Sequence, residues 1–465
     1  MAKNKSVFVC GDCGYESPGW LGKCPSCRSW NHFVEERVQS PPSENEKPSR
    51  RQNWTGEKAT VRLSDIQEEE GARFSSGLPE LDRVLGGGFV TGSIVLVGGD
   101  PGIGKSTLLL QTCHLAKAQG RVLYVSGEES ASQIRLRADR LQVDTSHITL
   151  STHTDFGQVA SLIEETRPCL CIIDSIQTLY SEELSSAPGS VGQVRESTAG
   201  LVRLAKNLKI TIVLVGHVTK DGALAGPRVL EHMVDTVLYF ESESSGAFRI
   251  LRAAKNRFGS TGELAFFEMT SQGLSEIQNP SSLLLSGRPI GIPGSVVTSS
   301  VQGTRNILIE IQALTNPTSY AIPQRIAQGL DKNRLGLLLA VTEKRFSLGL
   351  NNLDVYINIV GGVRITETSC DLAISAAVFS SLKNRPVRRD TLILGEIGLT
   401  GEIRPVSDVR KRIADVSRFG FSACVLPGSN KVGLTHAPQK IDDCPEFIFV
   451  DTLSEAMDIL FSGGA

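Results

Sequence analysis

Residues 61–275 alternate short, continuous apolar segments with longer segments of helical periodicity. The apolar segments include "GSIVLVGGD", "RVLYVSGEE", "CLCIIDS" and "ITIVLVGHV", and helical patterns such as "TLLLQTCHLAKAQG" and "LVRLAKNLKI" occur between them. Strands without a polar face are typical of parallel sheets that helices cover on both sides. The pattern therefore predicts an α/β domain with a parallel sheet over these residues.

Two polar segments separate this domain from its neighbours. Residues 39–60 are rich in Pro, Ser and charge, which is a linker composition, and residues 276–289 form a second polar break. From residue 290 to 465, alternating strands such as "RNILIEIQALT" are followed by helices such as "CDLAISAAVFSSL". We expect this part to be a separate α+β domain, and residues 1–38 to be a small third module.

The N-terminal module carries four of the ten cysteines within eighteen residues. Cys10, Cys13, Cys24 and Cys27 form two C-x2-C pairs ten residues apart, with glycines beside them. Four thiolates without an open position are typical of a structural zinc site, so we expect a zinc knuckle that needs its metal to fold. Disulfide pairing is the alternative. Nucleic acid and protein both remain possible partners of this knuckle.

Composition indicates the cellular compartment of the protein and the kinds of ligand that it can bind. No segment approaches the roughly 18 apolar residues that a membrane span requires, and the start of the chain lacks an apolar signal-peptide core. We therefore expect a cytoplasmic protein without a membrane partner, in which the six scattered cysteines stay reduced and buried. The formal charge of −2 means that binding to nucleic acid must depend on local basic surfaces.

The segment "GGDPGIGKST" matches the phosphate-binding pattern G-x4-G-K-[ST] between an apolar strand and a helix. Its backbone N–H groups, the helix N-terminus and the Lys105 ammonium are expected to bind the phosphates of ATP, while Ser106 and Asp174 hold Mg²⁺. Asp174 ends the apolar strand of "CLCIIDS". The expected nucleotide-binding residues are Gly99, Asp100, Pro101, Gly102, Ile103, Gly104, Lys105, Ser106 and Thr107.

Two adjacent carboxylates in "YVSGEES" are candidates for positioning the attacking water. Glu128 and Glu129 follow a strand that ends beside the phosphate loop, and in-line positioning is what phosphoryl transfer needs. We favour Glu128, because Glu129 suits the N-terminus of the next helix. At the end of another strand, His217 is placed either to sense the γ-phosphate or to be an ordinary hydrogen-bonded surface group.

The motifs "GGDPGIGKST", "SGEES", "CIIDS", "GHVTKDGALAGPRVLEH" and "KNRFG", after the four-cysteine knuckle, resemble the bacterial RadA (Sms) family of recombination ATPases. The resemblance spans nearly the whole chain. It implies a RecA-like P-loop ATPase core that assembles as a hexameric ring. It also implies ATP-driven movement on single-stranded DNA and branch migration of recombination intermediates together with RecA. An ATP-dependent protease and a nucleotide-switched scaffold are the alternative functions.

The C-terminal domain resembles the proteolytic domain of Lon. That chemistry needs a serine activated by a lysine. By alignment the serine position falls on Asp371 and the lysine position on Arg410, with the nearby Ser369 and Lys411 as alternatives. An arginine stays protonated, so we expect no peptidase activity. The domain is expected to oligomerise and either to contact DNA through cations or to expose them to solvent: Lys383, Arg385, Arg388 and Arg389.

Five other cations lie in segments that, in the implied ring, would face the central channel or the interfaces between subunits. Arg195, Lys220 and Arg228 lie in Gly-rich polar loops and are the candidates for contact with DNA phosphates. Lys255 and Arg257 of "KNRFG" precede a turn and are expected to complete a neighbouring subunit's ATP site. A contact with DNA, or a solvated hairpin, is the alternative for this last pair.

Overall fold

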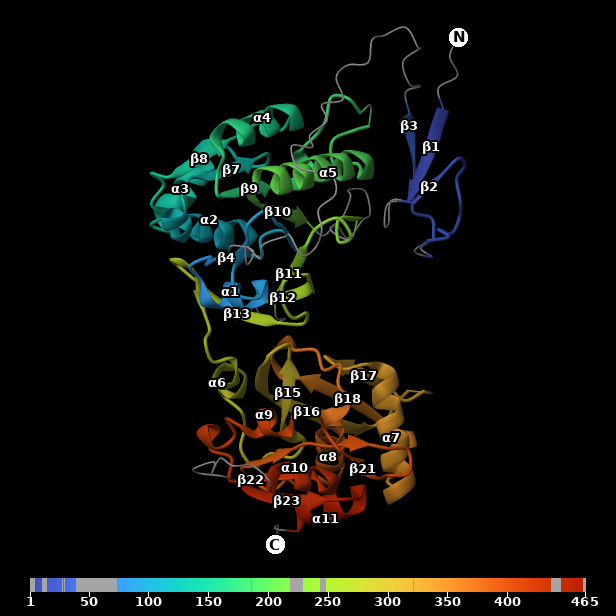
Figure 1. Ribbon diagram of the computed structural model, residues 1–465. Helices are drawn as coiled ribbons and strands as arrows, with labels where there is room; N and C mark the ends of the chain where they lie inside the picture. Colours follow the sequence, from blue (N-terminus) through green and yellow to red (C-terminus); the bar gives the residue numbers. More distant parts are fainter. Residues whose placement is uncertain are drawn as a thin grey trace, which may run out of the picture. The chain divides into compact units, whose positions relative to one another are not determined.

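The computed structural model describes residues 5–10, 15–26, 28, 30–38, 73–184, 186–217, 229–242, 248–320, 322–435 and 445–462. The chain divides into two compact units, residues 1–277 and 278–465 (Figure 1). The expected linker 39–60 lies outside the described residues, as do Cys13, Cys27, Lys220 and Arg228. No helix in the described ranges has the length and hydrophobicity to cross a membrane.

The N-terminal module contains a three-stranded antiparallel sheet with the order β2-β1-β3. Its strands are β1 (Lys5–Cys10), β2 (Glu16–Ser17) and β3 (Phe33–Val38). Cys10, Cys24 and Phe33 are buried together, with Phe8 and Leu21 packed against them. This core is very small, as the sequence led us to expect for a module that depends on a metal.

A nine-stranded sheet forms the body of the first unit, in the order β14-β13-β12-β11-β6-β10-β9-β7-β8. Its six strands from β11 to β8 are parallel, and β12, β13 and β14 are antiparallel additions at one edge. The strands are β6 (Ile94–Gly99), β7 (Val122–Ser126), β8 (Ile148–Ser151), β9 (Leu170–Asp174), β10 (Thr211–His217), β11 (Thr236–Ser242), β12 (Phe248–Asn256), β13 (Leu264–Thr270) and β14 (Gly273–Glu276).

Helices cover both faces of this sheet (Figure 1). One face packs against α1, α2 and α3, and the other against α4 and α5. The helices are α1 (Pro79–Leu85), α2 (Lys105–Leu115), α3 (Ala131–Arg140), α4 (Phe156–Thr166) and α5 (Val191–Leu208), and a two-stranded ladder joins β4 (Arg73–Phe74) to β5 (Phe89–Val90). Side-chain caps from Ser130, Asp155 and Ser190 begin α3, α4 and α5. The continuous apolar strands of the sequence are thus buried on both sides.

The second unit is built on a mixed seven-stranded sheet with the order β17-β18-β16-β15-β19-β22-β23. Its strands are β15 (Ser295–Gln302), β16 (Arg305–Pro317), β17 (Arg325–Gln328), β18 (Leu353–Ile359), β19 (Thr391–Ile393), β22 (Ala423–Pro427) and β23 (Glu446–Val450), and β20 (Glu396–Ile397) pairs with β21 (Ile403–Arg404). The helices are α6 (Pro280–Leu285), α7 (Lys332–Phe346), α8 (Asp371–Lys383), α9 (Val409–Ile413), α10 (Lys431–Thr435) and α11 (Leu453–Phe461).

Helix α6 lies within residues 276–289, where the polar composition suggested a linker. The Ser281 hydroxyl accepts a hydrogen bond from the Leu308 backbone N–H at 3.0 Å, and Leu284 is buried. This part of the segment is therefore packed on β16 of the second unit. Its three consecutive leucines were the apolar signal that the surrounding Pro and Ser residues obscured.

Candidate functional site

The phosphate loop connects the end of β6 to the start of α2. Gly102 and Gly104 have φ angles of +76° and +115°, a region that residues with a Cβ rarely adopt. A Cβ on Gly104 would also lie 2.9 Å from the Met269 Cε atom. Both glycines are therefore required by the backbone that turns the loop into the helix, as the motif predicted.

Lys105 is the first residue of α2, and only 3% of its surface is exposed. Its ammonium group donates hydrogen bonds to the carbonyls of Gly99 at 2.8 Å and Asp100 at 2.9 Å. Burial lowers the pKa of Lys105, while the charges of Asp174, Glu128 and Asp100 act in the opposite direction. The loop therefore holds a buried cation that can pair with a phosphate anion, while the nearby carboxylates suit a divalent cation rather than the phosphate itself.

Strand register brings the other candidates to the same edge of the sheet. His217 on β10 is opposite Gly99 on β6, and Asp174 on β9 is opposite Ser126 on β7. The Asp174 carboxylate is 7% exposed and accepts a hydrogen bond from the Tyr124 hydroxyl at 2.6 Å. This contact fixes the carboxylate at the carboxyl end of the parallel strands, where ligands bind in open α/β sheets.

Glu128 lies between a serine and a histidine. The Ser175 hydroxyl donates to the Glu128 Oε1 atom at 2.5 Å, and the His217 Nε2 atom lies 3.2 Å from the same oxygen. His217 makes the largest contribution to a pKa of about 2 for Glu128, with further lowering by Ser175 and Lys105 against the effect of burial. The Glu128 side chain is thus a fixed, ionised carboxylate beside the phosphate loop.

Glu129 has a different role. Its two carboxylate oxygens accept hydrogen bonds from Arg137 on α3, at 2.6 and 2.7 Å. The bidentate pair holds the start of α3 and turns Glu129 away from the carboxylate position that Glu128 occupies. The geometry favours Glu128 over Glu129 as the residue that orients water.

Replacing Glu128 with glutamine should lower kcat for ATP hydrolysis by about 10²- to 10⁴-fold, the usual contribution of a positioned acid–base group. ATP affinity should change little, because the amide keeps the shape of the side chain. The two quantities can be measured by steady-state hydrolysis and by binding of a fluorescent ATP analogue. Glu129→Gln is the matched control, and equal losses of kcat in both variants would contradict the assignment.

Lys255 and Arg257 lie far from the phosphate loop of their own chain. Asn256 is opposite Thr236 at the start of β11, whereas the loop follows Gly99, which is opposite Phe240 of the same strand. Four residues along β11 separate the two points, about 13 Å at 3.3 Å per residue. The structure therefore does not bring this pair into the cluster formed by Lys105, Glu128 and Asp174.

Both cations of this hairpin contact the short segment that precedes β11. The Lys255 ammonium donates to the carbonyls of Glu231 at 2.7 Å and Val234 at 2.8 Å. The Arg257 guanidinium donates to the Asp235 carboxylate at 3.0 Å, and its side chain is 53% exposed. Burial, and then the charge of Arg257, lower the pKa of Lys255.

Two residues that the sequence analysis did not assign hold this hairpin in place. Asn256 is 9% exposed; its amide donates to the Val84 carbonyl at 3.1 Å and its oxygen accepts from the Phe258 backbone N–H at 2.9 Å. Arg73 donates to the carbonyls of Phe258, at 2.7 Å, and Gly86. The central Asn of the motif could have been suspected from its sequence context, whereas nothing near Arg73 in the sequence points to residue 258.

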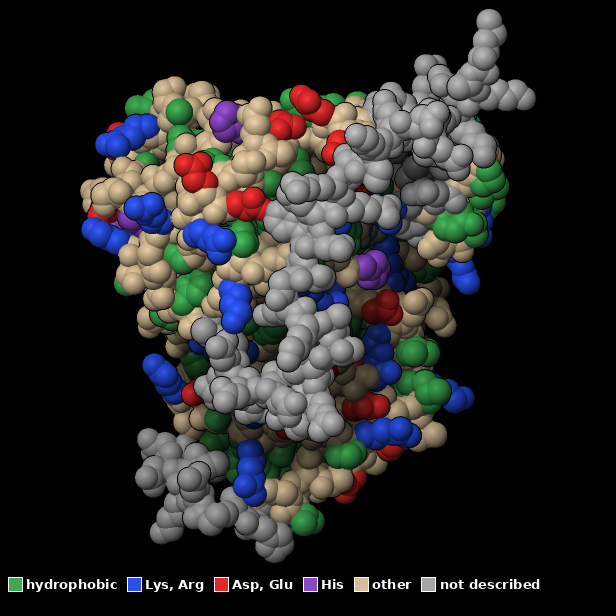
Figure 2. Space-filling model, turned by 45° about the horizontal axis from the view of Figure 1, so that its top comes forward, with side chains coloured by type: hydrophobic (Ala, Val, Ile, Leu, Met, Phe, Trp, Pro, Cys, Tyr) green, Lys and Arg blue, Asp and Glu red, His purple; other side chains and the backbone are tan. Residues whose placement is uncertain are grey.

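The candidates for DNA contact are only partly described. Arg195, which we expected in a loop, is instead exposed in the first turns of α5, because Ser190 caps the helix just before it, and Lys220 and Arg228 lie outside the described residues. In the second unit, Arg388 pairs with Glu446 at 2.6 Å and Arg385 donates to the Phe461 carbonyl. On the face in Figure 2, the described Lys and Arg side chains are scattered among Asp and Glu.

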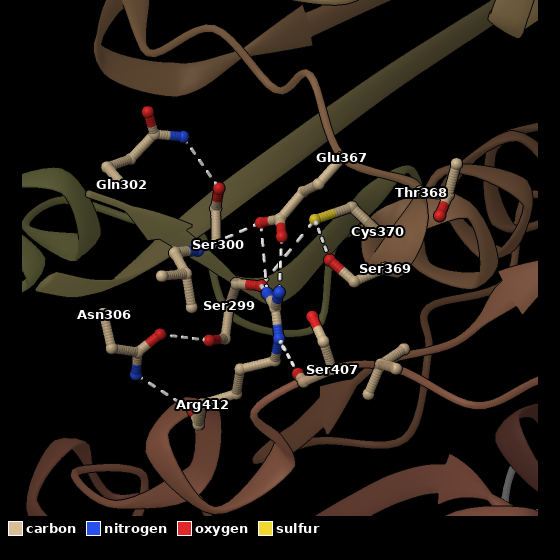
Figure 3. Close-up of polar contacts among 12 residues, drawn as sticks. Ser299, Ser300, Gln302, Asn306, Glu367, Thr368, Ser369, Cys370, Ser407 and Arg412 are labelled. Carbon is tan, nitrogen blue, oxygen red and sulfur yellow. Dashed lines mark hydrogen bonds and ion pairs between the residues drawn. The ribbon is translucent and has the colours of Figure 1, made fainter. Parts of the chain in front are cut away.

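A polar cluster in the second unit surrounds a buried arginine (Figure 3). Arg412 on α9 is 2% exposed and donates to both oxygens of Glu367. It also donates to the carbonyls of Ser407 at 2.8 Å and Ser299 at 3.2 Å, and its own carbonyl accepts from the Asn306 amide. The guanidinium thus donates four hydrogen bonds to buried or half-buried partners.

The positions that our alignment assigned to a serine–lysine pair do not meet. Asp371 is 1% exposed and pairs with Arg334 on α7, whereas Arg410 donates to the Gly433 carbonyl. Ser369, the alternative, belongs to the cluster of Arg412: its hydroxyl is 3.7 Å from the Cys370 sulfur, which in turn contacts the Ser299 carbonyl. The sequence alone does not reveal that Asp371 and Arg410 lie apart, because it does not show that the start of α8 directs Asp371 toward α7.

Three family models match separate parts of the chain. Residues 8–35 match the rubredoxin metal-binding domain, residues 58–223 the AAA domain, and residues 344–463 the Lon protease (S16) C-terminal proteolytic domain. The chain is 48% identical to the DNA repair protein RadA of Bacillus subtilis (strain 168) over 468 residues, which cover 100% of both proteins. The chain belongs to the RadA family of DNA repair proteins.

Other RadA proteins are similar over the same length. Those of Halalkalibacterium halodurans and Escherichia coli (strain K12) are 48% and 46% identical, with 99% of each chain covered. The predicted RadA family and fold class are confirmed: a metal-binding ribbon, a P-loop ATPase domain and a Lon-like domain. An AAA domain also implies ATP with Mg²⁺, and the oxygen donors of Ser106 and Asp174 suit that ion.

Proposed function

We propose that this protein is a DNA-dependent ATPase of recombination and DNA repair. In this proposal it translocates on single-stranded DNA and promotes branch migration of recombination intermediates together with the RecA recombinase. The observation that carries the proposal is the convergence of buried Lys105 with Asp174 and ionised Glu128 at one edge of a parallel sheet. The RadA relatives, named as DNA repair proteins, support DNA as the substrate on which this energy is used.

Each residue of the cluster has a defined task. Bound ATP with Mg²⁺ supplies the phosphoryl group that water attacks. Lys105 and the loop N–H groups neutralise charge on the phosphates, while Ser106 and Asp174 hold the cation. Glu128 orients the water, and His217 and Ser175 hold Glu128 in place. At the N-terminus, Cys10, Cys13, Cys24 and Cys27 are proposed to bind zinc, in keeping with the match to a metal-binding ribbon.

The cations of the hairpin fit a shared site between copies of the chain. Lys255 and Arg257 lie about 13 Å along the strands from their own loop and are held by carbonyls and a carboxylate there, so they do not complete that site within one chain. Supplied by a neighbour, they would stabilise charge that develops on the γ-phosphate. We therefore propose a homo-oligomer, a hexameric ring in view of the family resemblance, that hydrolyses ATP only when assembled.

Mixing experiments test this arrangement. Arg257→Ala should bind ATP normally and lose about 10³- to 10⁵-fold in hydrolysis, as removal of a cation supplied in trans does. A mixture of Arg257→Ala with Lys105→Ala should regain part of the activity, because some interfaces then combine an intact loop with an intact cation. Lys255→Ala is expected to behave similarly. Without any recovery in mixtures, the pair would be reassigned to contact with DNA.

The function itself is tested by hydrolysis and by DNA movement. Single-stranded DNA should stimulate ATP hydrolysis, and the stimulation should fall steeply as salt is raised, because phosphate contacts release counterions. The protein should also extend branch migration on a three-strand recombination intermediate, with Lys105→Ala as the inactive control. Absence of stimulation at low salt would favour a nucleotide-switched scaffold. Peptidase activity is left out of the proposal because the expected serine and lysine positions carry Asp371 and Arg410, and an arginine stays protonated and cannot act as the base.

A further inference from the structure

The N-terminal ribbon leaves its two largest side chains outside its core. Trp20 and Trp30 are 54% and 65% exposed, whereas the core is made by Cys10, Cys24 and Phe33. The whole chain has only three tryptophans. A module this small gains most from burying apolar surface, so indoles that contributed to its stability would be packed against that core. Their exposure indicates that they contact something else.

Each indole is held in place by the ribbon backbone. Trp30 is opposite Lys23 in an antiparallel bridge, and the Lys23 ammonium lies 5.2 Å from the centroid of the Trp30 ring. Trp20 lies over Gly22, where a Cβ would be 3.7 Å from the ring. The Gly22 carbonyl accepts a hydrogen bond from Asn31 at 2.9 Å and joins the two segments. The rings are thus positioned on adjacent segments and not on a loose tail.

The segment that carries the indoles has cationic side chains and no carboxylates, between Glu16 at one end and Glu35 at the other. Residues 17–34 contain Lys23, Arg28 and His32 and no Asp or Glu, although the chain as a whole has a formal charge of −2. Flat aromatic faces beside cations suit a ligand that has both planar rings and negative charge. Single-stranded DNA has this chemistry, since its bases stack on aromatic side chains while its phosphates attract Lys and Arg.

We propose that the ribbon binds single-stranded DNA by stacking bases on Trp20 and Trp30, with Lys23 and Arg28 facing the phosphates. The inference deepens the proposed function, which requires the protein to meet single-stranded DNA. It assigns to the metal-binding module a contact that the ATPase unit does not need for hydrolysis. The stacking surface reads no base sequence, because every base offers a flat face.

Intrinsic fluorescence of the full-length protein tests the stacking. In a Trp54→Phe background, Trp20 and Trp30 are the only tryptophans, so emission reports on the ribbon alone. We expect an oligothymidylate to quench this emission, and an abasic oligonucleotide of equal length to quench it much less. Trp30→Ala should weaken binding of the oligothymidylate roughly 5- to 150-fold, which corresponds to the usual contribution of one stacked base. Trp30→Phe, which keeps a ring, should recover part of that loss.

The results separate this inference from the proposed function. Stimulation of ATP hydrolysis by DNA without any quenching would leave the ATPase proposal intact and overturn the stacking surface. Equal quenching by the two oligonucleotides would show that charge alone binds the ribbon, which also overturns it. Quenching by a recombinase protein and not by DNA would assign the indoles to a protein partner. The bound metal should be quantified in every variant, so that loss of the ribbon fold is recognised.

Discussion

Lys105→Ala is expected to reduce ATP hydrolysis by at least about 10²- to 10³-fold, the effect of removing one group that stabilises transition-state charge. Only 3% of the Lys105 surface is exposed, and its ammonium group is held by the carbonyls of the loop. The hairpin cations of the same chain are about 13 Å away along the strands. Steady-state hydrolysis at saturating ATP measures the loss.

A second lysine provides the matched control. Lys117, just after α2, is 58% exposed and pairs with Asp144 on the surface. Lys117→Ala should hydrolyse ATP at the normal rate, because surface ion pairs contribute little. If Lys105→Ala kept hydrolysis within a few-fold of Lys117→Ala, the buried cation would not be the group that receives the phosphates.

Arg412→Ala is expected to destabilise the second unit by about 3–5 kcal/mol, the typical cost of breaking a buried ion pair from one side. Burial favours the neutral form of Glu367, but hydrogen bonds and charge from Arg412 outweigh it and keep the pKa of Glu367 below its ordinary value. Without Arg412, the Glu367 carboxylate stays buried but loses the hydrogen bonds and the positive charge of that guanidinium, which lower its pKa. Hydrogen exchange of peptides from residues 344–463 in the full-length protein measures the change.

The loss of stability in Arg412→Ala should depend on pH, and the pKa of Glu367 determines the direction of that dependence. In the native protein the lowered pKa of Glu367 contributes stability above the pKa of the unfolded chain, and this stability is lost as pH falls through the folded pKa. In Arg412→Ala the pKa of Glu367 rises, so ionisation at neutral pH becomes unfavourable. The destabilisation should therefore be larger at pH 7 than in acid.

Two further variants distinguish the ion pair from general damage to α9. Arg410→Ala, one turn before the end of the same helix, removes an exposed guanidinium that contacts only the Gly433 carbonyl among the described residues, and should cost within about 0.5 kcal/mol. Replacing both members, as Arg412→Met with Glu367→Leu, should recover much of the lost stability. A double variant as unstable as Arg412→Ala would show that the cost is not electrostatic.

Local patterns predicted the parts of the fold whose causes are local. The phosphate loop is a run of glycines whose backbone angles are required where they stand, and the parallel sheet follows from strands with no polar side. Lys105, Glu128, Asp174 and His217 could be grouped from sequence because each follows or ends such a strand. The register of β6, β7, β9 and β10 then brings their ends together.

Contacts between distant segments could not be read in this way. Arg73 meets the carbonyl of Phe258 across 185 positions, and Arg412 meets Glu367 across 45. Each of these residues looks like a surface cation in its own neighbourhood, and only the tertiary structure gives it a buried or carbonyl partner. For the same reason, the sequence could not show that Asp371 and Arg410 do not meet. The direction of a side chain at the start of a helix depends on what that helix packs against.

The phosphate loop and the hairpin cations lie at opposite ends of the same strands. If these two elements complete one site between copies, every copy gives to one neighbour and receives from the other, so the assembly is head-to-tail. An open row of such copies would have a terminal member whose cations serve no site and another whose site lacks cations. Closure of the row removes both defects at once, because every site then receives its cations from a neighbour.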